Sequence, residues 1–134
     1  MVVDDEQSIG ELIVFLLAQH GYQAEYAACG SNALQMLEAA PVDLVLTDFM
    51  MPVMNGVELV REMRARKELA AIPVLMVSAI PEEVVRKNLM ASIAFLGKPF
   101  SAMKLLDCVR NTLGHPQTEA SGHVLRTEPY APPN

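Results

Sequence analysis

The chain has 134 residues, of which 51% are hydrophobic and 19% charged, and its formal net charge at pH 7 is -6. This length fits one domain with one hydrophobic core. The acidic balance argues against non-specific nucleic-acid binding, which needs a basic surface to neutralise phosphates. No apolar run is long enough to cross a bilayer, and acidic residues stand where a signal peptide would be basic. We therefore expect a soluble, cytoplasmic protein.

The first predicted elements are a short strand and an amphipathic helix. Only residues 1–3 precede an acidic pair, so the first strand is short. Between Ser8 and Gln19 apolar side chains recur at helical spacing. Gly21 follows this segment and is expected to end the helix, as a glycine at a helix C-terminus commonly does. The apolar positions that define this helix are Ile9, Leu12, Ile13 and Leu16.

The next elements are an edge strand, a second helix and a buried strand. Residues 23–27 are short and mixed in character, as edge strands often are. Ser31 is expected to cap a helix that ends before Pro41. Residues 42–47 form an almost continuous apolar run, and Asn55-Gly56 marks a turn beyond it.

The second half of the chain repeats the alternation of helix and strand. Pro81 is expected in the first turn of a helix, where its missing N–H costs nothing. The remaining predicted elements are a helix at 57–66, a strand at 74–77, a helix at 82–90, a strand at 93–97 and a helix at 101–113.

These units predict an α/β fold. Strands rich in Val and Leu without alternation are buried on both faces, as parallel strands are. Five strand–helix units over residues 1–114 therefore predict one three-layer, doubly wound domain with a five-stranded parallel sheet. Residues 115–134 carry four of the nine prolines and almost no periodic apolar pattern, which predicts a disordered tail.

Five polar residues stand where the apolar strands stop: Asp4, Asp5, Asp48, Ser78 and Lys98. The carboxyl ends of parallel strands meet at one edge of the sheet, where ligands bind in open α/β folds. Three carboxylates, a hydroxyl and an ammonium group in one crevice suit a divalent cation and a phosphoryl group. Without a cation, three close carboxylates would raise one another's pKa.

A family resemblance rests on these residues and their neighbours. The motifs are Asp4-Asp5, the run from Asp48 to Pro52 with Gly56 eight residues after Asp48, Ser78-Ala79, and Lys98-Pro99-Phe100. Together, in this order and at strand ends, they resemble the receiver domain of two-component response regulators. The resemblance covers nearly all of the part predicted to fold. It implies the flavodoxin-like strand order 2-1-3-4-5.

The resemblance also implies the role of each acidic residue. Asp48 would be the phosphoacceptor. Asp5 would bind Mg²⁺ directly and Asp4 through water, and Asp48 and the backbone carbonyl of Met50 would complete the protein ligands. The phosphoryl group would come from a sensor histidine kinase or a His-phosphotransfer protein.

The remaining site residues would bind the phosphoryl group and report it. Lys98 would pair with one phosphoryl oxygen, and Ser78 would hydrogen-bond another. The peptide bond between Lys98 and Pro99 can be cis. Phe95 matches the position of a switch aromatic. The face made by the fourth helix, fifth strand and fifth helix would then contact a downstream protein, and it is also a candidate surface for a homodimer.

Two apolar residues stand where this family tunes the loss of the phosphoryl group. Met50 and Ile80 each lie two residues past a site residue. Apolar side chains there would orient attacking water poorly, which predicts a long-lived phosphorylated form.

Other interpretations of these residues stay open. Asp4 and Asp5 could cap the following helix, Ser78 could cap the helix after Pro81, and the methionines at 50, 51 and 54 could simply pack around the loop. Cys29 and Cys108 are expected to be buried thiols rather than a disulfide. The histidines show no partner pattern and are expected at the surface: His20, His115 and His123.

Alternative functions are a phosphorylation-independent interaction module with a vestigial site, a metal-dependent phosphatase and a flavodoxin-like cofactor binder. The phosphatase would need a second acid where Met50 stands. The cofactor binder would need a phosphate-cradling loop where the acidic pair stands. We therefore expect a phosphoacceptor switch that catalyses only its own phosphorylation and dephosphorylation, with no direct nucleic-acid contact.

Overall fold

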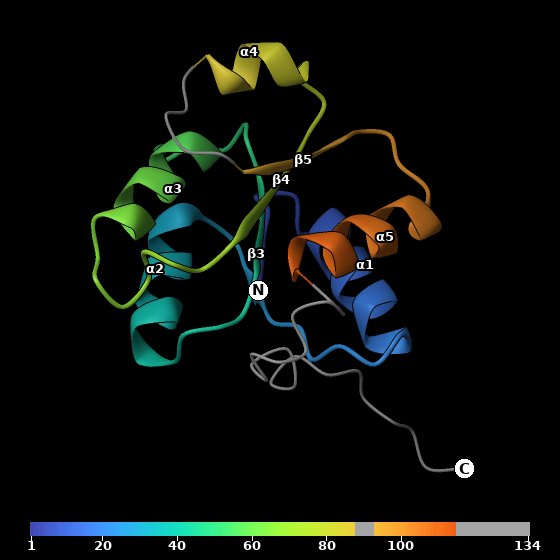
Figure 1. The fold of residues 1–134 in the computed structure, drawn as a ribbon, viewed down its shortest axis with the longest axis horizontal. Coiled ribbons are helices and arrows are strands. Elements are labelled where there is room, and N and C mark those ends of the chain that lie inside the picture. Colours follow the sequence, from blue (N-terminus) through green and yellow to red (C-terminus); the bar gives the residue numbers. More distant parts are fainter. Residues whose placement is uncertain (88–92, 115–134) are drawn as a thin grey trace.

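The computed structural model describes residues 1–87 and 93–114. They form a five-stranded parallel sheet in the order β2-β1-β3-β4-β5, with helices on both faces (Figure 1). The predicted α/β class and strand order are confirmed. Residues 88–92 and the predicted tail, 115–134, lie outside the described residues.

The strands are short, and β1, β3 and β4 are buried along their whole length. The first strand is short, as predicted, with two residues, yet it pairs with neighbours on both sides: Val2 lies opposite Tyr26 and Leu46. The bounds are β1 Val2–Val3, β2 Tyr26–Ala27, β3 Val45–Asp48, β4 Val74–Ser78 and β5 Ala94–Gly97.

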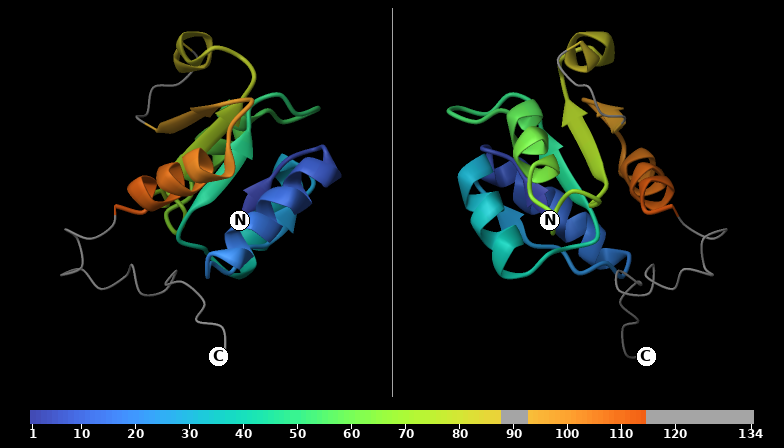
Figure 2. Two further views of the ribbon diagram at one scale, coloured as in Figure 1. Left: turned by 90° about the vertical axis from the view of Figure 1, so that its right-hand side faces the viewer. Right: turned by 60° about the vertical axis from the view of Figure 1, so that its left-hand side comes forward.

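The helices make the outer two layers. Helices α2 and α3 cover one face of the sheet and α1 and α5 the other, which Figure 1 shows edge-on and Figure 2 from two further sides. The described part of α4 is short and lies at the top of Figure 1, above β4 and β5. The bounds are α1 Gln7–Gln19, α2 Gly30–Ala39, α3 Gly56–Arg64, α4 Glu82–Arg86 and α5 Ala102–Thr112.

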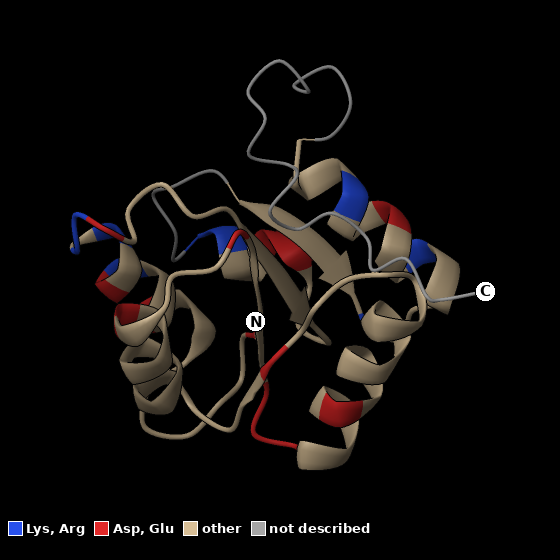
Figure 3. Cartoon of the chain, turned by 90° about the horizontal axis from the view of Figure 1, so that it is seen from below, with Lys and Arg blue, Asp and Glu red and all other residues tan. Residues whose placement is uncertain are grey.

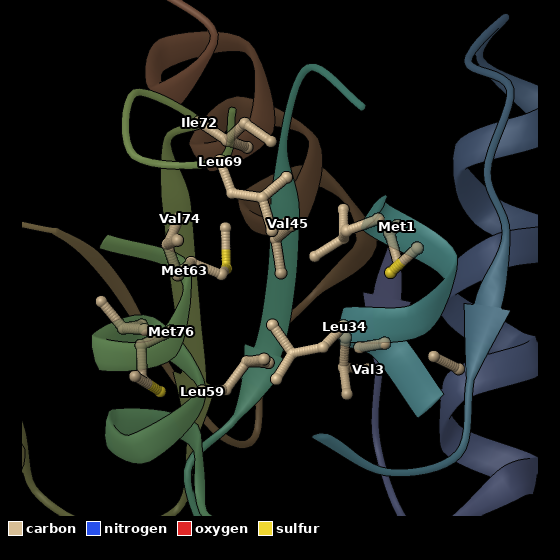
Figure 4. Packing of buried hydrophobic residues seen from close by; sticks show 14 of the residues in the cluster. Met1, Val3, Leu34, Val45, Leu59, Met63, Leu69, Ile72, Val74 and Met76 are labelled. Atoms are coloured by element: carbon tan, nitrogen blue, oxygen red, sulfur yellow. The ribbon is translucent and has the colours of Figure 1, made fainter. Parts of the chain in front are cut away.

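Each face of the sheet has its own hydrophobic cluster. Under α2 and α3, Leu59, Met63 and Met76 are fully buried with side chains from the central strands (Figure 4). Under α1 and α5, Leu75 and Leu105 are equally buried. Burying a side chain of this size stabilises a fold by about 1.5–3 kcal/mol. Because the buried side chains come from the strands and from the helices that cover them, the two clusters fix the positions of the strands and of their ends.

Helix starts differ from the predictions in two places. Asn55 is the N-cap of α3, not only a turn residue: it accepts a hydrogen bond from the Glu58 N–H at 2.8 Å, and its own N–H donates to the Glu58 carboxylate at 2.9 Å. The prediction that Ser31 caps α2 was wrong, because the N-cap is Cys29, two residues earlier, and α2 begins at Gly30.

Strand starts and one proline also differ. The edge strand begins only at Tyr26, and β3 begins at Val45 instead of residue 42, while both predicted ends hold to within one residue. Pro81 is the N-cap of α4 and so precedes its first turn. Gly21 follows α1 with φ of 92°, a conformation that glycine adopts without strain, as predicted.

The apolar face of α1 is wider than the part of the helix that the fold covers: Leu12, whose spacing fits that face, is 51% exposed. Cys29 and Cys108 are free thiols, as predicted, but both are only half-buried.

Charged residues are spread over several elements. The basic residues of the described part fall into small groups on several elements, including α3 and α5 (Figure 3). The acidic run from Asp4 to Glu6 directly precedes α1. Among the described residues, no helix has the length and apolar character needed to cross a membrane.

Candidate functional site

The acidic residues predicted at the strand ends lie together. Asp4 follows β1 and Asp48 ends β3, and the pairing of Val3 with Thr47 places them side by side. Asp4 is 3% and Asp48 8% exposed, whereas Asp5 is an exposed residue. One carboxylate oxygen from each of the three lies within 4.8 Å of the others. Hard oxygen donors in this arrangement fit a divalent cation such as Mg²⁺.

Asp4 is fixed by three hydrogen bonds. Its N–H donates to the Ala27 carbonyl at 3.2 Å, and its carbonyl accepts from the Tyr26 hydroxyl at 2.7 Å. Its side chain accepts from the Glu6 N–H at 2.8 Å. Helix α1 has no side-chain cap, so helix capping by Asp4 or Asp5 is not observed. The sequence reasoning missed Tyr26, because contacts between separate elements leave no periodic signal.

Lys98 reaches into the cluster from the loop after β5. Its Nζ lies 3.4 Å from Oδ2 of Asp48 and 3.6 Å from Oδ2 of Asp4. Its backbone N–H donates to the Ser78 carbonyl at 2.9 Å, and its bond to Pro99 is cis. The ammonium group therefore balances part of the charge of two buried carboxylates.

The pKa of the Asp48 carboxyl is raised above its ordinary value. Burial is the largest cause, Lys98 opposes it, and the negative charge of Asp4 adds to it. The sequence predicted mutual repulsion of the carboxylates, but loss of hydration contributes more. The ionised form of Asp48 is thus under-stabilised in the metal-free protein, and a bound cation would relieve this.

Replacing Asp48 by asparagine is therefore expected to stabilise the metal-free protein at pH 7. A raised folded-state pKa means that the native protein binds the proton more tightly than the unfolded chain does. Stability is then lost as pH rises from the unfolded pKa through the folded one. Thermal unfolding in EDTA should show a higher melting temperature for Asp48→Asn at pH 7.

The same comparison at acidic pH is the control. Below the unfolded pKa the carboxyl is neutral in both states, so the advantage of Asp48→Asn should vanish. Asp107→Asn, at an exposed position of α5, should show no such gain at pH 7. An Asp48→Asn protein less stable than the wild type at pH 7 would contradict the electrostatic argument.

Ser78 is almost fully buried at the end of β4, and its Oγ accepts a hydrogen bond from the Ile80 N–H at 2.9 Å. It does not cap α4, whose N-cap has no side-chain hydrogen bond. Ser78 pairs with Gly97, and Phe95 lies two residues before that glycine. A Cβ added to Gly97 would lie 3.8 Å from the half-buried Phe95 ring, an ordinary van der Waals contact.

The residues that follow the site residues differ in exposure. Met50 is 60% exposed, so the expectation that it packs around the loop was wrong, whereas Met51 is buried. Ile80 and Met54 are half-buried. His20 is exposed, as predicted, whereas the other two histidines of the chain, His115 and His123, lie outside the described residues.

Gly56 is needed by the site for its lack of a side chain. A Cβ at this position would collide with the carbonyl oxygen of Asp48 and would lie 2.7 Å from Sδ of Met76. The Gly56 N–H donates to the Phe49 carbonyl at 2.8 Å. The first residue of α3 is thus packed directly against the backbone that carries Asp48.

Curated relatives are signalling proteins of which this chain spans only part. It is 40% identical over 109 residues to the sensor histidine kinase TmoS of Ectopseudomonas mendocina, covering 80% of this chain and 11% of that protein. It is 35% identical over 135 residues to the sensory transduction protein RegX3 of Mycobacterium tuberculosis, covering 96% of this chain and 58% of that protein.

Solved structures share the fold over most of the chain. The chemotaxis protein CheY4 of Vibrio cholerae has a TM-score of 0.78 and 30% identity, covering 83% of this chain and 94% of that one. The receiver domain of sensor histidine kinase PA1611 from Pseudomonas aeruginosa, solved with a magnesium ion in its active-site cleft, has a TM-score of 0.77 and 27% identity. It covers 85% of this chain and 95% of that one.

The family model of the response regulator receiver domain matches residues 1–110. That range contains the whole sheet and every residue of the acidic cluster. The chain therefore belongs to the receiver domain family of two-component response regulators.

Proposed function

We propose that this receiver accepts a phosphoryl group on Asp48 from the phosphohistidine of a sensor histidine kinase or a His-phosphotransfer protein. The observation that supports it best is the cluster itself: three carboxylates with donor atoms within 4.8 Å, and Lys98 at 3.4 Å from Asp48. In this proposal the chain is a switch that catalyses only its own phosphorylation and dephosphorylation.

Mg²⁺ is the proposed cofactor, held by Asp5 and Asp48, by Asp4 through water, and by the Met50 carbonyl. The residues fit it, because all donors are hard oxygens, and because burial, with a smaller contribution from the charge of Asp4, raises the pKa of Asp48, which a bound cation would oppose. A bound Mg²⁺ would neutralise charge on the transferred group and on Asp48. The related PA1611 receiver was solved with magnesium in its cleft.

Asp48 is the proposed nucleophile in an in-line transfer. One of its carboxylate oxygens forms the new bond to phosphorus while the phosphorus–nitrogen bond of phosphohistidine breaks. The electron pair leaves with the imidazole nitrogen, which then binds a proton. Transfer of this kind depends mainly on positioning and charge neutralisation, and Lys98, close to both Asp48 and Asp4, supplies a positive charge where the phosphoryl oxygens would lie.

The output of the switch is proposed to run through Ser78 and Phe95. A phosphoryl oxygen would attract the Ser78 hydroxyl, which in this structure accepts a hydrogen bond from Ile80. Movement of Ser78 would then free space into which the Phe95 ring could turn, and this would change the face of α4, β5 and α5. We propose that this face contacts a downstream protein or a second copy of the chain.

Intact-mass spectrometry after incubation with acetyl phosphate tests the function. We expect a single phosphoryl adduct that requires Mg²⁺, disappears with EDTA and is absent from Asp48→Asn. Asp107→Asn is the matched control, because it removes an exposed aspartate of α5 and should keep the adduct. No adduct on folded wild-type protein, or an adduct that persists in Asp48→Asn, would contradict the proposal.

Replacing Met50 by asparagine is expected to shorten the lifetime of the phosphorylated form. The side chain is 60% exposed beside the acceptor strand, so the change should not disturb the core. An amide there can hold a water molecule for attack on phosphorus, which a thioether does poorly. Loss of the adduct with time measures the effect. Met103→Asn, at an even more exposed position on α5, is the control, and an unchanged decay in Met50→Asn would refute the role.

A further inference from the structure

We propose that Tyr26 is a positioning residue for the acidic pair, because its hydroxyl fixes the peptide that joins Asp4 to Asp5 and so sets the affinity of the site for Mg²⁺. The inference rests on the proposed metal-dependent function. It concerns a side chain on the edge strand β2, outside the motifs that suggested the site.

The backbone of Asp4 is held by β2 at both of its polar groups. Its N–H donates to the Ala27 carbonyl at 3.2 Å, which continues the pairing of β1 with β2. Its carbonyl accepts a hydrogen bond from the Tyr26 hydroxyl at 2.7 Å, an ordinary distance for a hydroxyl donor. The Tyr26 hydroxyl thus restrains the Asp4 backbone at the point where the pairing of β1 with β2 ends.

The bonded carbonyl belongs to the peptide between the two proposed cation ligands. The atoms of a peptide unit lie in one plane. The direction of the Asp4 carbonyl therefore also fixes the position of the Asp5 N–H and Cα, which belong to the same peptide unit. Asp4 has further restraints through Glu6 and Lys98. Among the hydrogen bonds and ion pairs recorded for the described part, none involves the Asp5 side chain, so its orientation depends on this peptide.

Helix α1 has a glycine where the tyrosine ring lies. Gly10 is inside α1 and its φ is not in the left-handed region, so its own backbone does not require glycine. Glycine is unfavourable in a helix interior. A Cβ at Gly10 would collide with the ring of Tyr26, with Cδ1 only 2.6 Å away. The two residues fit each other, and the missing side chain lets the hydroxyl reach Asp4.

Tyr26→Phe removes the hydroxyl and keeps the ring. We expect its dissociation constant for Mg²⁺, measured by calorimetry, to rise about tenfold, as is usual when a group that orients a metal ligand is lost. The ¹³C resonance of the Asp4 carbonyl should also shift in the metal-free protein, which a loss of general stability would not produce. Saturating Mg²⁺ should restore phosphorylation by acetyl phosphate.

Tyr22→Phe is the matched control, because Tyr22 is half-buried near the opposite end of α1 and loses the same atom. Gly10→Ala is a second variant: it keeps the hydroxyl but displaces the ring, and should weaken Mg²⁺ binding in the same direction. Wild-type affinity in Tyr26→Phe, with an unshifted Asp4 carbonyl, would overturn the proposal. Wild-type protein that binds no Mg²⁺ would instead refute the proposed function on which it rests.

Discussion

Replacing Lys98 by alanine is expected to slow phosphorylation by acetyl phosphate by about a hundredfold at saturating Mg²⁺, the usual loss when one preorganised group that stabilises transition-state charge is removed. Its Nζ lies 3.4 Å from Asp48 and 3.6 Å from Asp4, so alanine leaves both buried carboxylates without this ammonium group. Lys98 also lowers the pKa of Asp48. The acid side of the pH–rate profile should therefore move to higher pH in Lys98→Ala.

Two variants make this experiment specific. Lys104→Ala removes an exposed lysine of α5 and should leave the rate unchanged. Lys98→Arg keeps the charge but replaces a compact ammonium by a planar guanidinium, so it should recover only part of the rate. Phosphorylation of Lys98→Ala at nearly the wild-type rate would show that the cation alone neutralises the incoming group.

Replacing Gly56 by alanine is expected to lower the free energy of unfolding by about 3 kcal/mol, the upper end of the usual cost of overpacking. The added Cβ would collide with the Asp48 carbonyl oxygen and would lie 3.0 Å from the Phe49 Cα. Both atoms belong to the backbone, which cannot turn away as a flexible side chain would. Relief requires α3 to move away from β3, and urea denaturation measures the loss.

Gly97→Ala is the matched control for this substitution. Its Cβ would meet only the Phe95 ring at 3.8 Å, an ordinary contact, so stability should change little. Gly56→Ala should also weaken Mg²⁺ binding, because the displaced backbone carries Asp48. Equal stability of the two variants would show that the loop after β3 yields more easily than the packing suggests.

The sequence predicted correctly that these polar residues lie close together, because they stand where strands end, a boundary that a sequence makes visible. Apolar runs end at Asp4, Asp48, Ser78 and Lys98, and parallel strands bring such ends together. The structure confirms that the acidic residues and Lys98 are neighbours. Their chemical roles stay predictions until the phosphorylation and metal-binding experiments are done.

What the sequence could not predict depends on contacts between separate elements. Nothing in the sequence spacing of Tyr26 and Gly10 indicates that the Tyr26 ring occupies the place that a side chain at position 10 of the helix would take. Helical periodicity marked Leu12 as apolar but not how wide an arc the sheet covers. The raised pKa of Asp48 was predicted from neighbouring charges, whereas burial, which a sequence shows poorly, contributes more.

The two-residue length of β1 links ion binding to local unfolding. This strand connects β2 to the rest of the sheet through few backbone bonds, including Val2 to Glu25 at 2.7 Å and Leu46 to Met1 at 2.8 Å. Opening of this edge would carry Asp4 away from Asp48 and destroy the site. Ligand binding to the closed form alone suppresses such opening, so amide protons of β1 and β2 should exchange more slowly with Mg²⁺ present.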